Sequence, residues 1–400
     1  MRRRVVITGM GAVSAFGIGV EKLWNGLSTG QSAIGPLRPI TEGSLKFSTG
    51  AEFGAFTPES ELSREYLLLA DRNAQFALLA AAEAVRNSGI SLPKDSAIVT
   101  GCCVGGKVIE DLGYWEVYRE QKPRVHPLTI PKVMSNAAAS LIAMEHKVMG
   151  PVFTVSTACS SANHAIGQAF WMLRNGAVDV ALAGGSEAPF VFGLLKAWEA
   201  MRVVSPDTCR PFSKDRNGMS LGEGAAMLVL EELESARARG ATILAEIAGF
   251  GMSADAHHIT QPNPEGAALA MKMALRDAEV APEDVGYVNA HGTGTLANDP
   301  SECAALRIAF GPHAERLAVS STKSMHGHAL GAAGALEAVA TVKALESGIF
   351  PPTANFGTAD PECDLDWIPN SPRKLSTAAA LSNSFAFGGL NAVLVFRKLA

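Results

Sequence analysis

The sequence of 400 residues predicts an α/β fold in layers, built from two similar halves. Short β-branched and apolar runs alternate with segments of helical spacing along the chain, which favours strands connected by helices. The alternation starts again near Ala241, after a first series has ended. With 48% hydrophobic residues, a chain of this length can bury a large core. We therefore expect two halves, residues 1–245 and 246–400, with largely parallel sheets.

The first half is expected to begin with a buried strand at residues 4–8 and a tight turn at 9–14. A glycine-rich turn is expected at 101–106, after the next strand. The strands of this half are predicted at 4–8, 96–100, 152–155, 178–183 and 226–230. Its helices are predicted at 20–27, 63–88 and 136–149, and from just after Cys159 as far as Asn175.

The second half repeats the alternation of strands and helices. Its strands are predicted at 244–249, 285–290, 318–322, 378–383 and 392–396. Its helices are predicted at 265–278, 300–310 and 331–347. Connections between these segments are short, and neither half shows a low-complexity tract or an accessory domain.

Composition argues against several classes of function. The formal net charge of -5 provides no basic field, so binding to nucleic acid is not expected. No apolar run approaches the roughly 20 residues that a membrane span needs. The first four residues, Met-Arg-Arg-Arg, lead into a strand without the apolar region of an export signal. Six cysteines without a C-x-x-C pair indicate a reduced, cytoplasmic protein.

A nicotinamide-dependent oxidoreductase is one alternative, because the first strand and its glycines resemble the start of a dinucleotide fingerprint. The match is incomplete. Ser14 occupies the third small position, a Phe-Gly-Ile-Gly loop precedes the next helix, and no acidic residue closes a second strand about 20 residues on. The sequence therefore disfavours this alternative.

Cys159 follows the strand at 152–155 and precedes a helix, so it lies at a strand-to-helix turn. Unpaired N–H groups and the positive end of a helix dipole favour a thiolate at such a position. We therefore expect a lowered pKa and a nucleophilic role for Cys159. The alternative is a buried free cysteine that only fills space.

Three loops of the second half are expected at strand ends, where an α/β enzyme builds its site. The first contains His291 and the second contains Lys323, His326 and His328. The third loop is 383–389, which is rich in glycine and phenylalanine. Each polar side chain alone could be an ordinary hydrogen-bonded or solvated loop residue.

A metal site is the alternative for the paired histidines, His326 with His328 and His257 with His258. No carboxylate or cysteine stands at a recognisable ligand spacing from either pair, so no metal is expected. The vicinal pair Cys102–Cys103 is likewise expected to pack beside its tight turn rather than to bind metal or to act in redox chemistry.

Three motifs together resemble those of the β-ketoacyl-acyl carrier protein synthases. They are T-A-C-S-S at 157–161, H-G-T-G-T at 291–295 and K-S-x-x-G-H at 323–328, in that order. The resemblance covers essentially the whole chain. It implies a thiolase-like fold of five layers and a decarboxylative Claisen condensation on acyl carrier protein. It also implies a homodimer, or a heterodimer with a subunit similar to a chain-length factor.

The resemblance also implies roles for the site residues. Cys159 would accept the acyl group from its carrier, and His291 and His328 would donate hydrogen bonds to the enolate oxygen that decarboxylation of malonyl thioester produces. The backbone N–H groups of Cys159 and Phe387 would form the oxyanion hole, and Phe387 would belong to a gating loop. The reaction then needs neither a metal ion nor an organic cofactor.

Further positions match the family residue by residue. Lys323 would bias the local field, and Glu337 would hold the loop and His328 in place. Thr293 and Thr295 would contact the pantetheine arm of the carrier. Val104 would line the acyl pocket.

The match also extends to a surface position, where Arg210 would dock the carrier protein. His326 stands where the family more commonly has threonine, so we expect it to be a neighbour of the site and not the catalyst.

The sequence also departs from the family pattern. Ala386 replaces a flexible glycine of the gating loop, Leu390 replaces a threonine, and Ala162-Asn163 replaces a small-glycine pair. The segment 63–69 is largely apolar where relatives carry basic docking residues, and its leucines are expected to belong to the core. The alternative is that they mark an unusual carrier or a partner subunit. These departures favour a specialised polyketide, polyene or modified-lipid pathway over housekeeping fatty-acid elongation.

Two related functions remain as alternatives. A non-catalytic partner that only measures product length is disfavoured by the intact Cys159, His291 and His328. A thiolase is disfavoured because the loop 383–389 lacks the second catalytic cysteine of that relative.

Overall fold

The computed structural model of the chain describes residues 2–39 and 43–399, and its main feature is one mixed sheet of 11 strands. Met1, with which the predicted first half begins, lies outside the described residues. The first half contributes β1 (Val5–Ser14), β2 (Gly17–Ile18), β5 (Ala97–Gly101), β6 (Val152–Val155), β7 (Val180–Glu187) and β8 (Gly224–Glu232). The second half contributes β9 (Ala245–Ala254), β10 (Val285–Asn289), β11 (Ala318–Ser320), β14 (Ala379–Ala386) and β15 (Leu390–Arg397). Two small ribbons are formed by β3 (Gly35–Pro36) with β4 (Thr49–Gly50) and by β12 (Ile349–Phe350) with β13 (Arg373–Lys374).

The two halves have the same strand order. The first half reads β6-β5-β7-β8-β1, and the second reads β11-β10-β14-β15-β9, in which each strand has a counterpart at the same place. The prediction of two similar α/β halves is therefore confirmed. The antiparallel pairing of β1 with β9 joins the two sets of strands into a continuous sheet.

The strands are less parallel than the sequence predicts. Pairing is parallel for β5 with β6 and β7, and for β10 with β11 and β14. The remaining neighbours of the large sheet, such as β7 with β8 and β14 with β15, are antiparallel. The prediction of largely parallel sheets is thus wrong. A short turn suffices between β14 and β15, and only an antiparallel pair can use such a connection.

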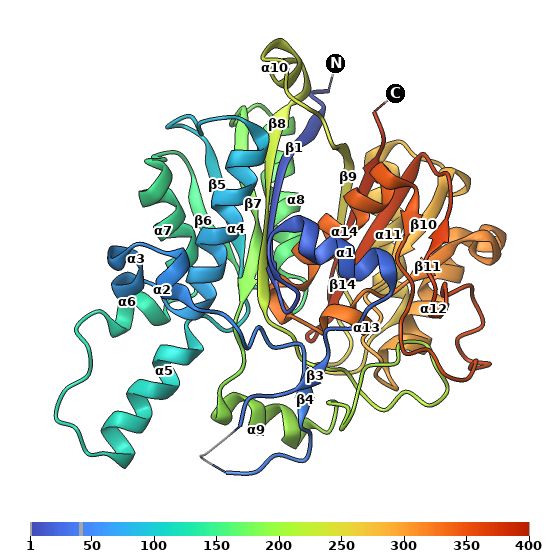
Figure 1. Cartoon of the computed structure of the whole chain (residues 1–400). Coiled ribbons are helices and arrows are strands. Elements are labelled where there is room, and N and C mark those ends of the chain that lie inside the picture. The colour runs from blue at the N-terminus through green and yellow to red at the C-terminus, as the bar shows by residue number, and fades with distance from the viewer. Residues whose placement is uncertain (1, 40–42, 400) are drawn as a thin grey trace.

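The helices and the two halves of the sheet form five layers (Figure 1). The central layer contains α8 (Ser161–Arg174) and α14 (Ala333–Ser347), which contact each other and strands of both halves. The outer layers contain α4 (Arg72–Ser88) with α7 (Ala137–His146) on one side and α11 (Pro264–Ala278) with α12 (Asn298–Phe310) on the other. The largest core cluster includes side chains from both halves, so they share one hydrophobic interior.

The remaining helices lie at the periphery of these layers or around the site. They are α1 (Val20–Thr29), α2 (Pro58–Glu61), α3 (Arg64–Leu69), α5 (Lys107–Tyr114), α6 (Thr129–Val133), α9 (Phe192–Met201), α10 (Leu233–Ala238) and α13 (Lys323–His326). The π-helical turn Trp115–Arg119 extends α5, and this arm projects from the body at the lower left of Figure 1. Three short 3-10 turns are Pro282–Asp284, Gly311–Arg316 and Leu330–Ala332.

Two local predictions are corrected by packing. The expected turn at 9–14 is the second part of β1, because Gly9 and Gly11 lie against α4. A Cβ on Gly11 would lie 2.0 Å from the backbone oxygen of Ala80, so these glycines permit a close approach of strand and helix. The expected helix at 63–88 is divided into α3 and α4, because the Asp71 carboxylate caps the second helix.

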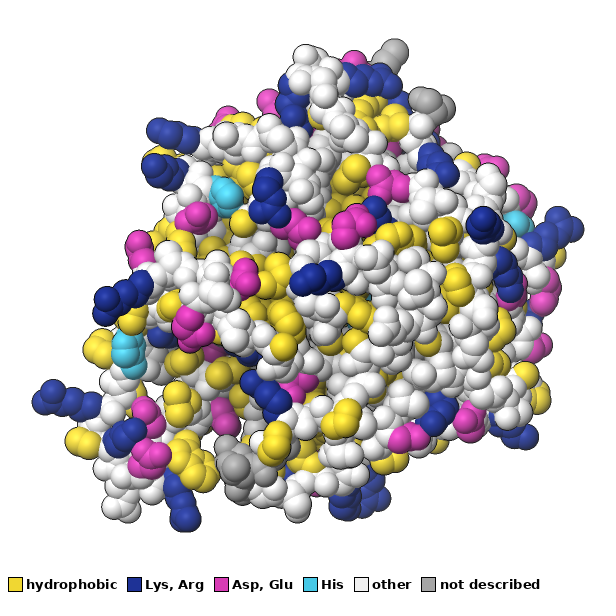
Figure 2. Space-filling view, in the orientation of Figure 1, with side chains coloured by type: hydrophobic (Ala, Val, Ile, Leu, Met, Phe, Trp, Pro, Cys, Tyr) yellow, Lys and Arg dark blue, Asp and Glu magenta, His cyan; other side chains and the backbone are white. Residues whose placement is uncertain are grey.

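Acidic and basic side chains are interspersed over the face in Figure 2, without a large field of one sign. No helix within 2–39 and 43–399 has the length and apolar character to cross a membrane.

The division after residue 245 falls immediately behind the first residue of β9, and we retain these domain limits as a proposal.

Candidate functional site

Cys159 lies between β6 and α8, as the strand-to-helix pattern predicts. The preceding residue, Ala158, has a φ of 50°, in the left-handed region that non-glycine residues rarely adopt. The hydroxyl of Ser161 holds this turn, since it accepts from the N–H of Thr157 and donates to the carbonyl of Ala158. The turn places Cys159 in an apolar cluster, and only 7% of its surface is exposed.

The expectation of a lowered pKa for Cys159 is wrong. Burial, with a smaller contribution from the nearby carboxylate of Glu187, raises the pKa of its thiol to about 12. Lys323 opposes this effect, as do the backbone N–H groups of Cys159 and Phe387, which point at the sulfur. The free-energy cost of burying a thiolate exceeds the stabilisation that Lys323 and these N–H groups provide, so the resting cysteine is a neutral thiol.

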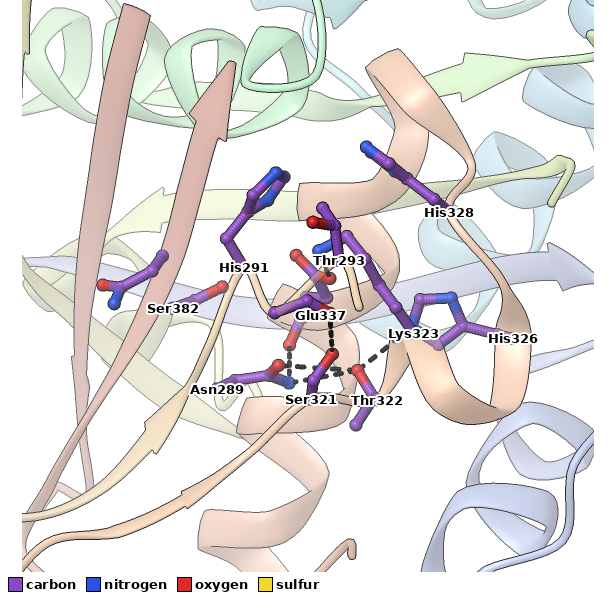
Figure 3. Close-up of polar contacts among 12 residues, drawn as sticks. Asn289, His291, Thr293, Ser321, Thr322, Lys323, His326, His328, Glu337 and Ser382 are labelled. Carbon is purple, nitrogen blue, oxygen red and sulfur yellow. Dashed lines mark hydrogen bonds and ion pairs between the residues drawn. The ribbon is translucent and has the colours of Figure 1, made fainter. Parts of the chain in front are cut away.

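His291 follows β10, and His328 follows α13, so two different strand-helix connections of the second half deliver the two rings. Their centroids are 5.4 Å apart and their planes are nearly perpendicular, at 85°. Both side chains line the same cavity as Cys159. In Figure 3 the rings of His291 and His328 lie in the upper part of the view, whereas His326 lies lower, beside Lys323.

The ring of His328 has a defined tautomer. Its Nδ1 accepts the backbone N–H of Leu330 at 3.2 Å, so the proton is carried by Nε2. This contact depends on a strained turn, because Leu330 has a φ of 46°. Nε2 is consequently a hydrogen-bond donor available to a substrate in the cavity.

Both histidines are neutral. Burial lowers the pKa of His291 and of His328 well below the ordinary value, and the positive charge of Lys323 lowers them further. A neutral imidazole donates a hydrogen bond without adding a formal charge. The pair is therefore suited to an oxygen that gains negative charge during a reaction.

Lys323 and Glu337 form a fully buried ion pair directly behind these rings. Burial raises the pKa of Glu337 to about 7, while Lys323 opposes the shift. The carboxylate thus acts on Lys323, and no hydrogen bond connects it to His328. The resemblance implies that Glu337 holds both the lysine loop and His328. A direct contact supports only the first of these roles.

His326 has a different environment. Its Nε2 lies 3.0 Å from the hydroxyl of Thr322, and burial lowers its pKa to about 3. The side chain is fully buried and is not part of the cavity lining. The structure thus places His326 beside the site and away from the reacting groups.

Two buried carboxylates hold the His291 loop, although sequence reasoning assigned them no role. Glu302 accepts the backbone N–H groups of His291 at 2.8 Å and of Gly292 at 2.7 Å. Asp299 accepts those of Gly294 at 3.2 Å and of Phe212 at 2.7 Å. The available signal was the acidic stretch that opens α12, immediately after the histidine loop. A carboxylate that binds two backbone donors restrains a loop that has no regular structure of its own.

The cavity at these residues has a volume of about 460 Å³. It brings together the predicted site residues Cys159, His291, His328, Thr293, Thr295 and Phe387. The hydroxyls of Thr293 and Thr295 are 2.9 Å apart. A cavity that combines a thiol, two imidazoles and two hydroxyls with apolar walls can bind and activate a thioester substrate.

Phe387 lies at the turn between β14 and β15 and stacks on Trp198 with a centroid distance of 6.2 Å. The turn is tied to a neighbouring loop by two backbone hydrogen bonds. Gly388 donates to the carbonyl of Ile259, and Asp255 donates to that of Gly389, each at 2.8 Å. These bonds restrain the backbone on the C-terminal side of Phe387.

Val104 and Arg210 do not reach the cavity. Val104 is half-buried, and its backbone N–H donates to Glu187 at 3.1 Å, while the neighbouring Cys103 packs against the cluster that contains Cys159. Arg210 is engaged by Asp207 and lies 3.4 Å from Asp215. Sequence reasoning missed Arg202, an exposed residue that lines the cavity mouth.

The structure shows where two departures from the family pattern lie. Asn163 is fully buried on α8, and its amide donates to the backbone carbonyls of Ser382 and Ala392 in the other half. Leu68 on α3 has 53% of its surface exposed, and neither Leu67 nor Leu69 is fully buried. The expectation that these leucines belong to the core is therefore wrong for Leu68, whereas Leu69 packs against the edge of a core cluster.

Among the side chains that the structure describes, no group of three or more His, Cys, Asp or Glu is arranged to hold a metal ion. His257 and His258 lie on an exposed loop. The six cysteines are free thiols.

Comparison with known proteins agrees with the geometry. The family model described as "Beta-ketoacyl synthase, N-terminal domain" matches residues 2–236, and "Beta-ketoacyl synthase, C-terminal domain" matches residues 244–357. The chain is 49% identical to "Nodulation protein E" of Rhizobium sp. (strain N33), with 100% of both chains covered. It is 41% identical to "3-oxoacyl-[acyl-carrier-protein] synthase 2" of Coxiella burnetii, with 100% of this chain and 99% of that protein covered.

The fold also matches solved structures over its full length. The structure titled "The ishigamide ketosynthase/chain length factor" superposes with a TM-score of 0.96 at 37% identity, and the match covers 100% of both chains. The agreement extends across both halves of the sheet and so includes every element that carries a site residue.

Proposed function

The chain belongs to the β-ketoacyl synthase family of acyltransferases, and from that membership we propose how its own residues carry out the condensation. The single observation that supports the assignment best is the convergence of Cys159, His291 and His328 on one cavity. These side chains come from opposite halves of the chain, and their order and chemistry suit two successive thioester reactions.

In the first reaction, Cys159 attacks the carbonyl carbon of an acyl thioester on a carrier protein. A new C–S bond forms to Cys159, the C–S bond to the carrier breaks, and the proton of the Cys159 thiol ends on the released carrier thiol. The tetrahedral intermediate carries an oxyanion, and the N–H groups of Cys159 and Phe387, which point at the sulfur, would bind it. The raised pKa of Cys159 means that proton removal accompanies this attack.

In the second reaction, malonyl thioester enters the same cavity and loses its carboxylate. The bond between the carboxylate carbon and C2 breaks, CO2 leaves, and its electron pair forms an enolate. His291 and His328 donate hydrogen bonds to the enolate oxygen. Neutral rings suit this task because each donates a hydrogen bond to the oxygen without adding a formal charge.

The enolate carbon then attacks the acyl carbonyl on Cys159. A carbon–carbon bond forms, the Cys159 sulfur leaves as a thiolate, and a proton from solvent restores the thiol. The product is a β-ketoacyl group that is two carbons longer and remains on the second carrier. No step of this scheme requires a cofactor.

We infer that the carrier is an acyl carrier protein, because the relative from Coxiella burnetii bears that carrier in its name. The same inference gives Thr293 and Thr295 the role of binding the pantetheine arm, since both hydroxyls line the cavity. Arg210 becomes a weaker candidate for docking, because Asp207 and Asp215 neutralise it. Arg202 at the cavity mouth takes its place.

We also propose that the chain forms a dimer through β6. This strand is at one end of the sheet, and Phe153 on it is exposed. The opposite end is covered, since Ala318 of β11 bridges to Asp366. The arm beyond α5 adds exposed aromatic side chains, including Tyr118 at 78% exposure. An apolar strand edge of this kind favours pairing with another chain.

A homodimer and a heterodimer with a subunit similar to a chain-length factor make different predictions. The purified chain alone should elute at twice 41.8 kDa if it forms a homodimer. Light scattering on a size-exclusion column measures this mass. A monomeric or aggregated chain that becomes a defined dimer only with a co-expressed partner would favour the heterodimer.

The pathway is proposed to be specialised. Identity is higher to a nodulation protein, at 49%, than to a 3-oxoacyl synthase, at 41%. Ala386 and Leu390 also alter the loop that covers the nucleophile. We place the enzyme in the cytoplasm, where six free thiols would remain reduced.

The test follows the acyl group by intact mass. The chain is incubated with acyl-carrier proteins of different chain length and then with malonyl-carrier protein, and Cys159→Ala serves as control. An acyl adduct that is absent from the control and disappears when malonyl-carrier protein is added would support the proposal. Failure to form an adduct with any carrier, by a folded dimer, would contradict it.

A further inference from the structure

Glu187 is a fully buried carboxylate for which the condensation scheme has no role. It is the last residue of β7 in the first half of the chain. Its two oxygens accept three backbone N–H groups, from Cys103 at 2.7 Å, Val104 at 3.1 Å and Gly331 at 3.0 Å. The thiol of Cys102 lies 3.5 Å from it as a fourth donor.

These donors belong to two loops from opposite halves. Cys103 and Val104 lie in the glycine-rich turn after β5, and the side chain of Cys103 packs against the cluster that contains Cys159. Gly331 follows Leu330, whose N–H fixes the tautomer of His328. Glu187 therefore connects the wall beside the nucleophile with the turn that orients the histidine.

The junction has little freedom. A Cβ on Gly331 would lie 2.5 Å from the backbone nitrogen of Cys103 and 2.6 Å from Glu187 Oε2. The backbones of the two loops are therefore in direct contact around the carboxylate. Each N–H would be left unsatisfied in a buried site if the carboxylate were removed, which is unfavourable.

We propose that Glu187 is a positioning residue that couples the Cys103–Val104 loop to the turn that orients His328. A shift of the first loop moves the carboxylate, and the carboxylate moves Gly331 and Leu330. Because Cys103 packs against the cluster that contains Cys159, the wall beside the acyl group and the stabilisation of the enolate are then linked through one side chain. The inference rests on the proposed function of His328.

The substitution Glu187→Gln tests the coupling. The glutamine is similar in size, but its NH2 group faces backbone donors and cannot accept from them. We expect malonyl-carrier decarboxylation to fall at least tenfold and the ranking of acyl chain lengths to change in the same variant. Glu231→Gln is the matched control, because Glu231 is also buried but bonds Thr8 and Arg239 away from the cavity.

A second measurement needs no turnover. The ¹⁵N chemical shifts of His328 report its tautomer, and the signal is assigned with His328→Gln. The wild-type protein and Glu231→Gln should show the Nε2–H form, whereas Glu187→Gln should show a mixture. If Glu187 had only a structural role, Glu187→Gln would have a lower unfolding midpoint, and the tautomer of His328 would be unchanged at temperatures below that midpoint.

Several outcomes would overturn the inference. One is a folded Glu187→Gln that keeps the His328 tautomer together with wild-type decarboxylation and chain-length ranking. Another is a change in chain-length ranking without a change at His328. Should Glu187→Gln not fold, Glu187→Asp replaces it under the same criteria, since it keeps the charge and shortens the reach by one methylene. If the wild-type chain does not decarboxylate malonyl-carrier protein, the proposed function fails, and the tautomer measurement still judges the coupling.

Discussion

The ammonium group of Lys323 contacts the carboxylate of Glu337, and neither side chain is exposed to solvent. The pair lies next to two neutral histidines, whose pKa values the lysine helps to lower. An ion pair in this position contributes a fixed electric field while each charge compensates the other. Removal of one partner should therefore destabilise the protein more than the distance of that partner from the reacting atoms implies.

Lys323→Met should lower the free energy of unfolding by about 3–5 kcal/mol, because it leaves Glu337 buried without a partner. The loss should be smaller below the Glu337 pKa of about 7, since a protonated carboxyl needs no counter-charge. Urea denaturation at one pH above and one pH below this pKa measures the difference. Lys343→Met, which breaks a partly exposed pair with Glu21, is the control and should cost less than about 1 kcal/mol. Equal losses for the two variants would contradict the prediction.

His291→Ala and His328→Ala should each lower malonyl decarboxylation by about 10²–10³-fold, which is the usual effect of losing one donor to an oxyanion. Acyl transfer to Cys159 should continue in both variants, because the backbone groups proposed to bind its oxyanion are unchanged. Release of CO2 and intact mass measure the two steps separately. His326→Ala should retain decarboxylation. If this variant lost as much decarboxylation as His328→Ala, the assignment of His328 over His326 would be wrong.

Alkylation of Cys159 should report the raised pKa of its thiol. The pKa moves from an ordinary 9.0 to about 12, so the thiolate is scarce at neutral pH and increases as pH rises. The rate of reaction with iodoacetamide should therefore grow about tenfold per pH unit from neutral to alkaline pH. Peptide mapping identifies the modified cysteine. A plateau at neutral pH would mean that the helix and Lys323 outweigh burial.

Ala386→Gly should increase the rate of acyl transfer and reduce stability by about 0.5–1 kcal/mol, because glycine loosens the end of β14 beside the Phe387 turn. Stopped-flow measurement of adduct formation and thermal denaturation provide the two values. Ala380→Gly in the same strand is the control, with no gain in rate and a loss of stability at least as large, because Ala380 is fully buried. A slower transfer in Ala386→Gly would indicate that rigidity of the turn favours the reaction.

Local patterns were sufficient to predict most of the elements that carry the site. The strand and helix around Cys159 and the loop at His291 are where the sequence places them, because alternation and end signals act over a few residues. Lys323, expected in a loop, instead begins the short helix α13. The resemblance added the whole fold, and the family match and the identical strand orders of the halves confirm it.

What the sequence could not predict depends on contacts between distant segments. The pKa of Cys159 is set by burial, which no local pattern reports. Glu187 and Glu302 bind backbone N–H groups of loops that only the fold brings near, and such donors are invisible in a sequence. Gly9 and Gly11 suggested a turn, but they serve the close packing of β1 on α4.

The pairing of β1 with β9 has a consequence for how the chain could be rearranged. Val5 and Phe396 are both register partners of Ile247, on its two sides, so the first and last long strands are separated by two strand spacings, about 10 Å. A short linker could join these strands, and new ends could be opened at the exposed Gly240. Such a circular permutant would exchange the order of the halves while keeping the sheet and the cavity. The fold thus constrains how the halves meet and leaves open which of them is synthesised first.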